Sequence, residues 1–256
     1  MKSVKLEHLE NFSYSMTESL RALKTNLQFC GDDIKTILFT SAMPNEGKST
    51  VSFNLARSLT ESGKRVLLID TDMRKSVLVG RLRVKSQSWD EILGLSHYLS
   101  GQKKMVDVLY STQIPRLFMI FAGPSVPNPT EILEKNYFRE LIEAARSNFD
   151  YILIDCAPIG AAIDAAIVAK QCDGAVLVIA QGAVGTRMIV SVKKQLEASG
   201  VRILGAVLNK MQMEMGHYGK YYGRYYGSYY GSYYGNYYKN DDAETKTHKK
   251  EVEGSV

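Results

Sequence analysis

Apolar and polar positions alternate over the first ~210 residues in a pattern that predicts buried strands separated by amphipathic helices. Five runs of β-branched and other large apolar residues are almost continuous, which is typical of strands covered on both faces of a parallel sheet. We expect these strands at residues 36–41, 65–70, 151–156, 175–180 and 203–209. The segments between them carry apolar residues at helical spacing. They predict helices at residues 18–29, 50–62, 136–147, 162–171 and 186–199.

The helix predicted at residues 18–29 shows this spacing clearly. Leu20, Leu23 and Leu27 share one face, and Thr17 is its expected N-cap. Strands and helices that alternate in this way predict a doubly wound α/β fold with a mostly parallel sheet. Ligands in such folds bind at the carboxyl ends of the strands, so the residues directly after each apolar run are the candidates for chemistry.

The composition changes near Met211, where apolar runs give way to Gly, Tyr and polar residues and then to a charged end. We predict a globular domain over residues 1–211 and a flexible, disordered tail over residues 212–256. The tail repeats YYGx and holds eleven of the sixteen tyrosines. Its period of four is close to that of a helix, but each of its glycines costs ~1 kcal/mol relative to alanine in a helix.

Charge and cysteine content limit the classes of protein that fit. The formal net charge is +5, and the tail carries six basic and six acidic residues, so the excess belongs to the globular part. This charge is compatible with a nucleotide and too weak to argue for nucleic acid. The three cysteines lack metal-site spacing and the even count of a disulfide framework. No apolar run has the length of a signal or membrane segment, so we expect a cytoplasmic chain.

The segment SAMPNEGKST, residues 41–50, lies between a predicted strand and a predicted helix. It ends with the spacing of a phosphate-binding loop, GxxxxGK[ST], with Ala42 in place of the first glycine. Backbone N–H groups of such a loop point at phosphate oxygens, and Gly47 lets the backbone approach them closely. Lys48 would place its ammonium on the β- and γ-phosphates, and Ser49 would offer its hydroxyl to Mg²⁺.

Three aspartates stand at the ends of two further predicted strands. LLIDTDMR ends one strand with Asp70 and Asp72, followed by Arg74, and YILIDCAP ends another with Asp155. Carboxylates directly after buried strands are costly unless they are paired, hydrogen-bonded or bound to metal. Any one of them could be a loop cap, and GKST alone could be a solvated turn, but together they predict an Mg²⁺–ATP site. We predict ATP contacts from Asn45, Glu46, Gly47, Lys48, Ser49, Thr50 and Asn209.

Taken together, these motifs resemble the bacterial tyrosine kinases, or BY-kinases, of capsular and exopolysaccharide clusters. The second motif of that family, a hydrophobic run followed by D-x-D-x-R, is similar to LLIDTDMR. GPSVPNPTEIL, residues 123–133, resembles a family linker, and a tyrosine-rich tail is a family hallmark. The helix before the first strand carries E-x-x-R-x-x-R in the family, matched here by Glu18, Arg21 and Lys24. The resemblance covers nearly the whole chain, from about Glu18 to Tyr238.

Three positions depart from the family pattern. Asn45 stands where the phosphate loop usually has glycine, but asparagine tolerates the left-handed conformation, so we expect a changed nucleotide affinity and not its loss. Lys24 replaces an arginine and cannot form a bidentate fork, which weakens the expectation of self-association. Ala157 replaces a proline in the D-x-P-P segment.

The resemblance implies a P-loop domain that catalyses ATP-dependent tyrosine autophosphorylation in trans. It implies that Asp70 accepts the proton of the tyrosine hydroxyl, and that Asp72 and Asp155 hold Mg²⁺ through waters while Ser49 binds the ion directly. Lys48 would complete the catalytic set with Asp70 and Asp72. The sequence by itself does not assign these roles among the three aspartates.

The resemblance also implies partners. A kinase chain separate from its membrane segment would depend on a transmembrane activator, the chain-length regulator of polysaccharide synthesis, which recruits it to the inner face of the membrane. A cognate tyrosine phosphatase would reverse its phosphorylation. The kinase would assemble into a ring through Glu18, Arg21 and Lys24. Its role would be to regulate capsular or exopolysaccharide synthesis and export.

We interpret the tail as the substrate of this activity. A Gly-rich chain of the 27 residues from Gln212 to Tyr238 spans roughly 30 Å, enough to reach a neighbouring site. Eleven phosphates would add roughly −16 to −22 charges, and repulsion between tails would oppose assembly. The expected acceptors are Tyr218, Tyr221, Tyr222, Tyr225, Tyr226, Tyr229, Tyr230, Tyr233, Tyr234, Tyr237 and Tyr238.

Two other functions fit part of the sequence. A partition or septum-positioning ATPase shares the P-loop and the strand-end aspartates, but Met43 replaces the signature lysine that such proteins carry early in the loop. A tyrosine-rich interaction module would explain the tail and leave the ATP site unexplained. At the end of the last strand, Asn209 is either an adenine contact or a turn residue.

Overall fold

The structure is a computed structural model that describes residues 2–87 and 91–211. The predicted tail at residues 212–256, with its eleven tyrosines, lies outside these residues, so its interpretation stays a prediction. No helix of the described segments combines the length and the apolar character needed to cross a membrane.

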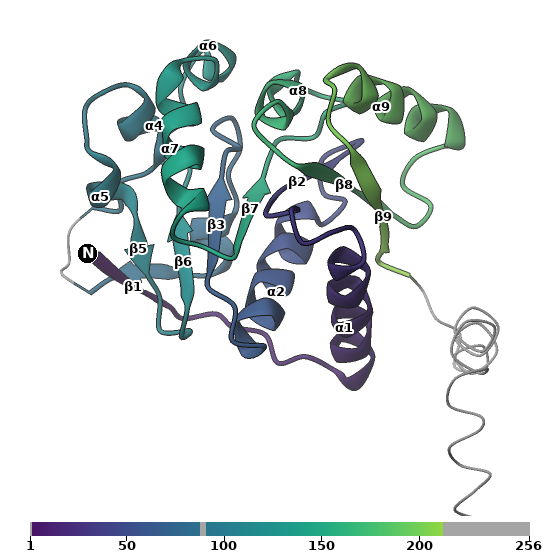
Figure 1. Ribbon diagram of the computed structural model, residues 1–256, viewed down its shortest axis with the longest axis horizontal. Helices are drawn as coiled ribbons and strands as arrows, with labels where there is room; N and C mark the ends of the chain where they lie inside the picture. The colour runs from purple at the N-terminus through teal and green to yellow at the C-terminus, as the bar shows by residue number, and fades with distance from the viewer. Residues whose placement is uncertain (1, 88–90, 212–256) are drawn as a thin grey trace, which may run out of the picture. The chain divides into compact units, whose positions relative to one another are not determined.

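The described residues contain one sheet of nine strands. These are β1 (Lys2–Leu6), β2 (Thr36–Ser41), β3 (Val66–Asp70), β4 (Val84–Ser86), β5 (Tyr110–Ser111), β6 (Leu117–Ile120), β7 (Tyr151–Asp155), β8 (Gly174–Ala180) and β9 (Ile203–Asn209). Their order across the sheet is β4-β1-β5-β6-β3-β7-β2-β8-β9 (Figure 1). Only β1 with β4 and β5 with β6 pair antiparallel in this part of the chain. The predicted mostly parallel sheet is therefore confirmed.

The five predicted strands are β2, β3, β7, β8 and β9, and their observed ends lie within one residue of the prediction. The strands that the pattern did not reveal are β1, β4, β5 and β6, with two to five residues each. Polar residues interrupt β1 and β4, and β5 and β6 are too short to show a period. These short strands extend the sheet beyond β3 on the side away from β9.

Helices cover both faces of the sheet. They are α1 (Tyr14–Gln28), α2 (Lys48–Glu61), α3 (Leu78–Arg81), α4 (Leu95–Leu99), α5 (Met105–Val108), α6 (Pro129–Leu133), α7 (Asn136–Arg146), α8 (Asp164–Ala169) and α9 (Thr186–Ala198). Apolar residues of α1, α2 and α3 belong to the core on one face, and those of α4 to α9 belong to the core on the other. The fold is thus the predicted doubly wound α/β arrangement.

The predicted helices correspond to α1, α2, α7, α8 and α9, but the expected start of α1 was wrong. The helix begins at Tyr14, and its N-cap is Ser13, whose hydroxyl accepts a hydrogen bond from the Met16 N–H at 3.2 Å. Thr17 lies inside the helix and donates to the Ser13 carbonyl at 3.1 Å. Tyr14 is 79% exposed, and the apolar positions that marked the helix all lie beyond its first turn. The sequence pattern therefore did not reveal this turn.

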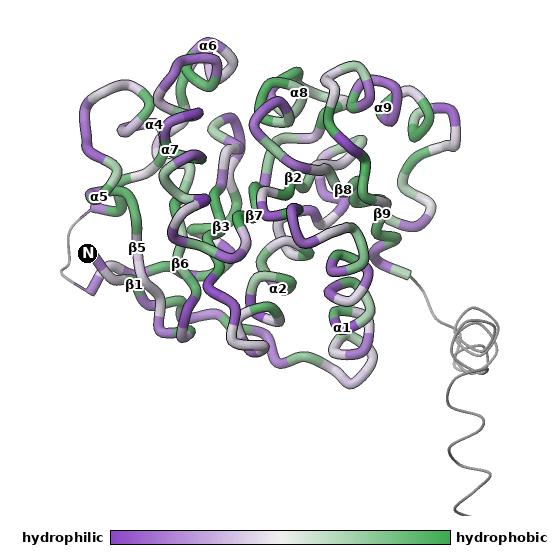
Figure 2. The backbone as a smooth tube through the Cα atoms, viewed as in Figure 1, coloured by the Kyte–Doolittle hydropathy of each residue, from purple (hydrophilic) through white to green (hydrophobic). Residues whose placement is uncertain are grey.

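The central strands send alternate side chains into the two cores. In β2, Ile37 and Phe39 face the core of α1 and α2, and Leu38 faces the other core. Figure 2 shows hydrophobic residues gathered along these strands, as a run buried on both faces requires. The carboxyl ends of β3 and β7 lie side by side, and their register pairs Asp70 with Asp155. The aspartates predicted to act together thus end adjacent strands.

Candidate active site

The phosphate loop joins β2 to α2 and contains two residues in the left-handed conformation. Asn45 has a φ of 67°, and Gly47 has a φ of 95°. The expectation that asparagine would adopt this conformation at position 45 is confirmed. A Cβ added to Gly47 would lie 2.1 Å from Nδ2 of Asn209, so a larger residue does not fit without movement of that side chain. Gly47 is therefore required both for its backbone angle and for its lack of a side chain.

Glu46 supports the loop from inside. Its Oε2 accepts hydrogen bonds from the N–H groups of Ala42, at 2.8 Å, and Met43, at 3.1 Å. The residue is buried, and its side chain is not part of the wall of the neighbouring cavity. Of the seven predicted ATP contacts, Glu46 is therefore the one that does not line the cavity, and its side chain bonds backbone groups of the loop instead.

The end of β9 holds the loop from outside. Asn209 donates from Nδ2 to the carbonyl of Glu46 at 2.9 Å, and Lys210 donates from Nζ to the carbonyl of Asn45 at 2.6 Å. Both side chains also line the cavity. The role of Asn209 in holding the loop is thus visible in the structure, and its contact with adenine stays a prediction.

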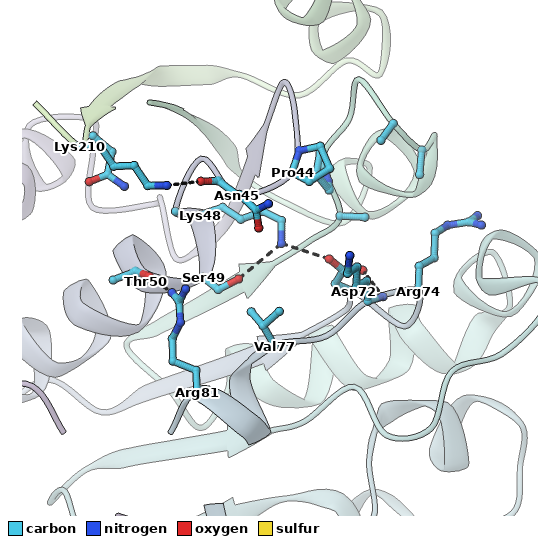
Figure 3. A pocket seen from close by; sticks show the side chains of 17 residues that line it. Pro44, Asn45, Lys48, Ser49, Thr50, Asp72, Arg74, Val77, Arg81 and Lys210 are labelled. Carbon is cyan, nitrogen blue, oxygen red and sulfur yellow. Dashed lines mark hydrogen bonds and ion pairs between the residues drawn. The ribbon is translucent and has the colours of Figure 1, made fainter. Parts of the chain in front are cut away.

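A cavity of about 560 Å³ opens at the carboxyl ends of β2, β3, β7 and β9 (Figure 3). Its volume lies in the range of small-molecule sites. The walls come from the phosphate loop, the start of α2 and the segments after β3, β7 and β9. The cavity brings together six of the predicted ATP contacts, Asn45, Gly47, Lys48, Ser49, Thr50 and Asn209.

Lys48 lies at the centre of the charged groups. Its Nζ is 3.1 Å from Oδ2 of Asp72 and donates to Oγ of Ser49 at 3.4 Å (Figure 3). The same nitrogen is 3.8 Å from Oδ1 of Asp155. Burial alone would lower the pKa of the Lys48 ammonium, but the charges of Asp155 and Asp72 outweigh it and raise that pKa. The ammonium is therefore charged at neutral pH, and the two carboxylates have the partner that their burial demands.

The carboxylates of Asp70 and Asp155 are buried and close to each other. Burial raises the pKa of Asp155 to about 6, although the Lys48 charge opposes this. Burial and then the charge of Asp155 raise the pKa of Asp70 to about 8. Asp70 accepts hydrogen bonds from the Asp72 N–H and the Ser76 hydroxyl, and it is not part of the cavity wall. Asp72, by contrast, faces the cavity directly.

Arg74 connects the D-x-D-x-R motif to two other segments. Its guanidinium binds both oxygens of Asp164, and the Thr130 hydroxyl donates to the same carboxylate at 2.7 Å. Thr130 belongs to the linker motif GPSVPNPTEIL, whereas no pattern in the sequence pointed to Asp164. Lys75, Arg81 and Lys210 are further cationic residues of the cavity wall that the sequence analysis did not single out.

The residues predicted to support self-association do not belong to the cavity wall. Glu18 and Arg21 form an ion pair of 2.6 Å on α1, and Lys24 donates from Nζ to Oγ of Ser62, at the end of α2, at 2.6 Å. The Arg21 side chain is 65% exposed. An exposed arginine next to a paired lysine is available to a neighbouring molecule, and the oligomeric role of these residues stays a prediction.

Comparison with known proteins identifies the family. The AAA domain family matches residues 34–205, about two thirds of the chain. The tyrosine-protein kinase CpsD of Streptococcus agalactiae is 43% identical over 204 residues, which cover 80% of this chain and 87% of that protein. The solved kinase domain of the Escherichia coli tyrosine kinase ETK has a TM-score of 0.70 and 30% identity, and the match covers 78% of this chain and 79% of that one.

The chain belongs to the BY-kinase family. It is therefore a protein-tyrosine kinase with a nucleotide-binding P-loop domain, and the recognition made from its motifs is confirmed.

A septum-site protein is a more distant structural neighbour. The structure of MinD from Pyrococcus horikoshii, complexed with Mg-ADP, has a TM-score of 0.60 and 26% identity, and the match covers 71% of this chain and 72% of that one. Both values are below those of the ETK kinase domain. The likeness supports the P-loop fold, and the comparisons favour the kinase over the septum-positioning ATPase.

Proposed function

We propose that this BY-kinase uses Mg²⁺–ATP to phosphorylate the tyrosines of its own C-terminal tail in trans, and thereby regulates the synthesis and export of a capsular polysaccharide or exopolysaccharide. The observation that carries the proposal is the convergence of Lys48, Asp72 and Asp155 at the mouth of the phosphate loop. A chain with this site also carries eleven closely spaced tyrosines after residue 212, which is a supply of acceptors for it.

The side chains around Lys48 fit a magnesium ion. Oδ1 of Asp155 is buried and has no hydrogen-bond partner, which leaves an oxygen for a cation or its waters. The described segments contain no group of three or more His, Cys, Asp or Glu side chains able to hold a metal by themselves. This suits Mg²⁺, which usually takes one or two carboxylates together with phosphate oxygens and waters. Ser49, Asp72 and Asp155 would be the residues that hold it.

The bound ion would neutralise the charge of the phosphoryl group during its transfer. Lys48 would bind phosphate oxygens with an ammonium that the neighbouring carboxylates keep charged. Backbone N–H groups of Gly47 and of the first turn of α2 would hold the same phosphates at the positive end of the helix dipole. These interactions orient the nucleotide with its terminal phosphate toward Asp72 and Asp155.

Asp70 is the proposed acceptor of the tyrosine proton. Its pKa of about 8 lies near the working pH, where a base combines adequate strength with a sufficient deprotonated fraction. Its two carboxylate oxygens accept hydrogen bonds from the Asp72 N–H and the Ser76 hydroxyl, and it does not line the cavity, so the site would have to rearrange for Asp70 to reach a tyrosine hydroxyl there. Asp72 already faces the cavity and is the alternative base.

The remaining proposals concern assembly. Glu18, Arg21 and Lys24 would contribute to a ring of kinase subunits in which each tail reaches a neighbouring cavity. A transmembrane activator would recruit the kinase to the inner face of the membrane, and a cognate phosphatase would reverse the modification. Phosphorylated tails would repel one another and favour dissociation of the ring.

A complementation experiment tests the proposal. Lys48→Met should abolish phosphotyrosine on the tail during incubation with Mg²⁺–ATP, because the cation that binds the phosphates is lost. Lys103→Met, at an exposed position outside the cavity, is the matched control and should keep the activity. Mixing the Lys48→Met protein with an active chain that ends at residue 211 should restore tail phosphotyrosine. Lack of restoration would contradict transfer in trans. A wild type that gains no tail phosphotyrosine in the presence of its activator would contradict the proposed autophosphorylation.

A further inference from the structure

Five cationic side chains line the cavity, and they differ in their partners. They are Lys48, Arg74, Lys75, Arg81 and Lys210. Lys48 is paired with carboxylates, Arg74 binds Asp164, and Lys210 donates to a carbonyl of the phosphate loop. Among the described residues, Lys75 and Arg81 have no carboxylate within ion-pair distance.

Arg81 holds the less favourable position of the two. It is the last residue of α3, and its guanidinium donates from Nη1 to the hydroxyl of Thr50 (Figure 3). Thr50 belongs to the first turn of α2, directly after Lys48 and Ser49. The N-terminus of a helix carries the positive end of its dipole, where a cation is destabilising and an anion is stabilising. In Arg81 the protein keeps a second cation, beside Lys48, where the helix dipole opposes it.

An anion in the cavity would resolve this conflict. A guanidinium whose only hydrogen-bonding contact in the described structure is a neutral hydroxyl has donors left for phosphate oxygens, which it can bind in a planar, charge-assisted geometry. We propose that Arg81 is a phosphate-binding residue of this kinase. The inference rests on the proposed binding of Mg²⁺–ATP at the phosphate loop.

The geometry also indicates which phosphate Arg81 binds. Lys48 and the carboxylates of Asp72 and Asp155 mark the end of the cavity where the terminal phosphate would lie. Arg81 contacts Thr50, on the α2 side of Lys48, and has no ion pair with those carboxylates. It therefore binds the part of the phosphate chain nearer the nucleoside, which ATP and ADP share. Its contribution to affinity is equal for the two nucleotides.

Calorimetric titration of the full chain with Mg-ADP, and with the Mg²⁺ complex of a non-hydrolysable ATP analogue, tests this. Arg81→Met should lower the affinity for both nucleotides by the same factor, about tenfold or more, as expected for the loss of a charge-assisted hydrogen bond. Arg81→Lys should lie between this variant and the wild type, because it keeps the charge and loses the fork. Arg83→Met, two residues along and outside the cavity, removes the same charge and should leave both affinities unchanged.

Each other outcome overturns the inference. If Arg81→Met binds only the ATP analogue more weakly, Arg81 contacts the terminal phosphate. If it binds both nucleotides as the wild type does, Arg81 contacts no phosphate. A purely structural contact with Thr50 would instead lower the melting temperature of Arg81→Met without nucleotide, whereas we expect it to stay equal or rise. If the wild type binds neither nucleotide, the proposed function fails together with this inference. If the wild type binds and the variant is unaffected, only the inference fails.

Discussion

Arg74 binds the carboxylate of Asp164 through two hydrogen bonds, with Nε 2.6 Å from Oδ2 and Nη2 3.0 Å from Oδ1. Thr130 donates to the same carboxylate at 2.7 Å. Burial alone would raise the pKa of Asp164, but the hydrogen bonds from Arg74 and Thr130 outweigh it and hold that pKa below its ordinary value. One buried carboxylate thus joins the segment after β3, helix α6 and helix α8 beside the cavity.

Arg74→Ala should lower the free energy of unfolding by about 2–3 kcal/mol at pH 7, because it leaves the buried carboxylate of Asp164 with a single neutral donor. The pKa of Asp164 is depressed in the folded state, so this contribution is present above about pH 4 and is lost as the pH falls through the folded value. Urea denaturation at pH 7 and pH 3 measures both effects. Arg139→Ala removes an exposed ion pair of 3.8 Å with Glu143 and should cost less than about 0.5 kcal/mol. Equal losses in the two variants would contradict the prediction.

Gly47→Ala should lower the affinity for nucleotide in addition to lowering the stability of the protein. The new Cβ would meet Nδ2 of Asn209 at 2.1 Å, and a φ of 95° is itself unfavourable for alanine by about 1–2 kcal/mol. Gly63→Ala is the matched control, because Gly63 also has a positive φ, of 80°, and a Cβ added there would meet no atom within 4 Å. We expect both variants to lose stability and only Gly47→Ala to lose affinity for Mg-ADP by calorimetry. A similar loss of affinity in both would show that the contact with Asn209 is unimportant.

The raised pKa of Asp70 predicts a pH-dependent stability. Since this pKa rises from 3.8 to about 8 on folding, the folded state binds the proton more tightly than the unfolded state does. Stability should therefore fall as the pH rises from about 4 to about 8, by at most about 1.4 kcal/mol per pH unit for this proton. Asp70→Asn, which is neutral throughout, should remove the fall in stability between about pH 6 and pH 8 in denaturant titrations of the nucleotide-free protein, whereas the fall below pH 6 should persist because the pKa of Asp155 is also raised.

Asp32→Asn, at an exposed position, is the control and should keep the wild-type dependence. If the fall between pH 6 and pH 8 survives in Asp70→Asn, the proton bound in this range does not belong to Asp70.

The repeated tail predicts redundancy among its acceptors. A single change such as Tyr229→Phe should lower total phosphotyrosine by roughly one eleventh, because ten equivalent tyrosines remain. Progressive replacement should lower it in proportion to the number replaced, as measured by intact-protein mass spectrometry. The phosphorylated protein should sediment as a smaller species than the unmodified one at physiological salt, since like charges oppose assembly. A phosphorylated preparation that keeps the larger size would exclude this switch.

The sequence predicted the central strands and the catalytic edge well because both follow from strong local signals. A strand buried on both faces must be apolar throughout, so β2, β3, β7, β8 and β9 stood out. The aspartates at their ends followed from the rule that ligands bind at the carboxyl ends of parallel strands. The structure brings Lys48, Asp72 and Asp155 together as that rule requires.

Other features could not be predicted because their determinants lie far apart in the chain. Asp164 is the first residue of an ordinary apolar helix, and only the fold places its carboxylate against Arg74, ninety positions earlier. Arg81 occurs in a short helix whose sequence, LVGR, has no period, and it acquires meaning only through its contact with Thr50. The cap of α1 was misplaced because the apolar spacing that marks the helix begins only at Leu20, so the turn that follows Ser13 gave no signal.

The direction of β9 has a consequence for where the chain leaves the sheet. This last strand runs parallel to β8 and ends at Asn209, so the chain leaves the sheet at the rim of the nucleotide cavity. Had the strand been antiparallel, its seven residues would have carried the point of departure about 23 Å away, to the opposite edge. The crossover through α9 therefore decides at which edge of the sheet the last described strand ends. The starting point of whatever follows Asn209 is in this sense a property of the topology, whatever the residues that come after it.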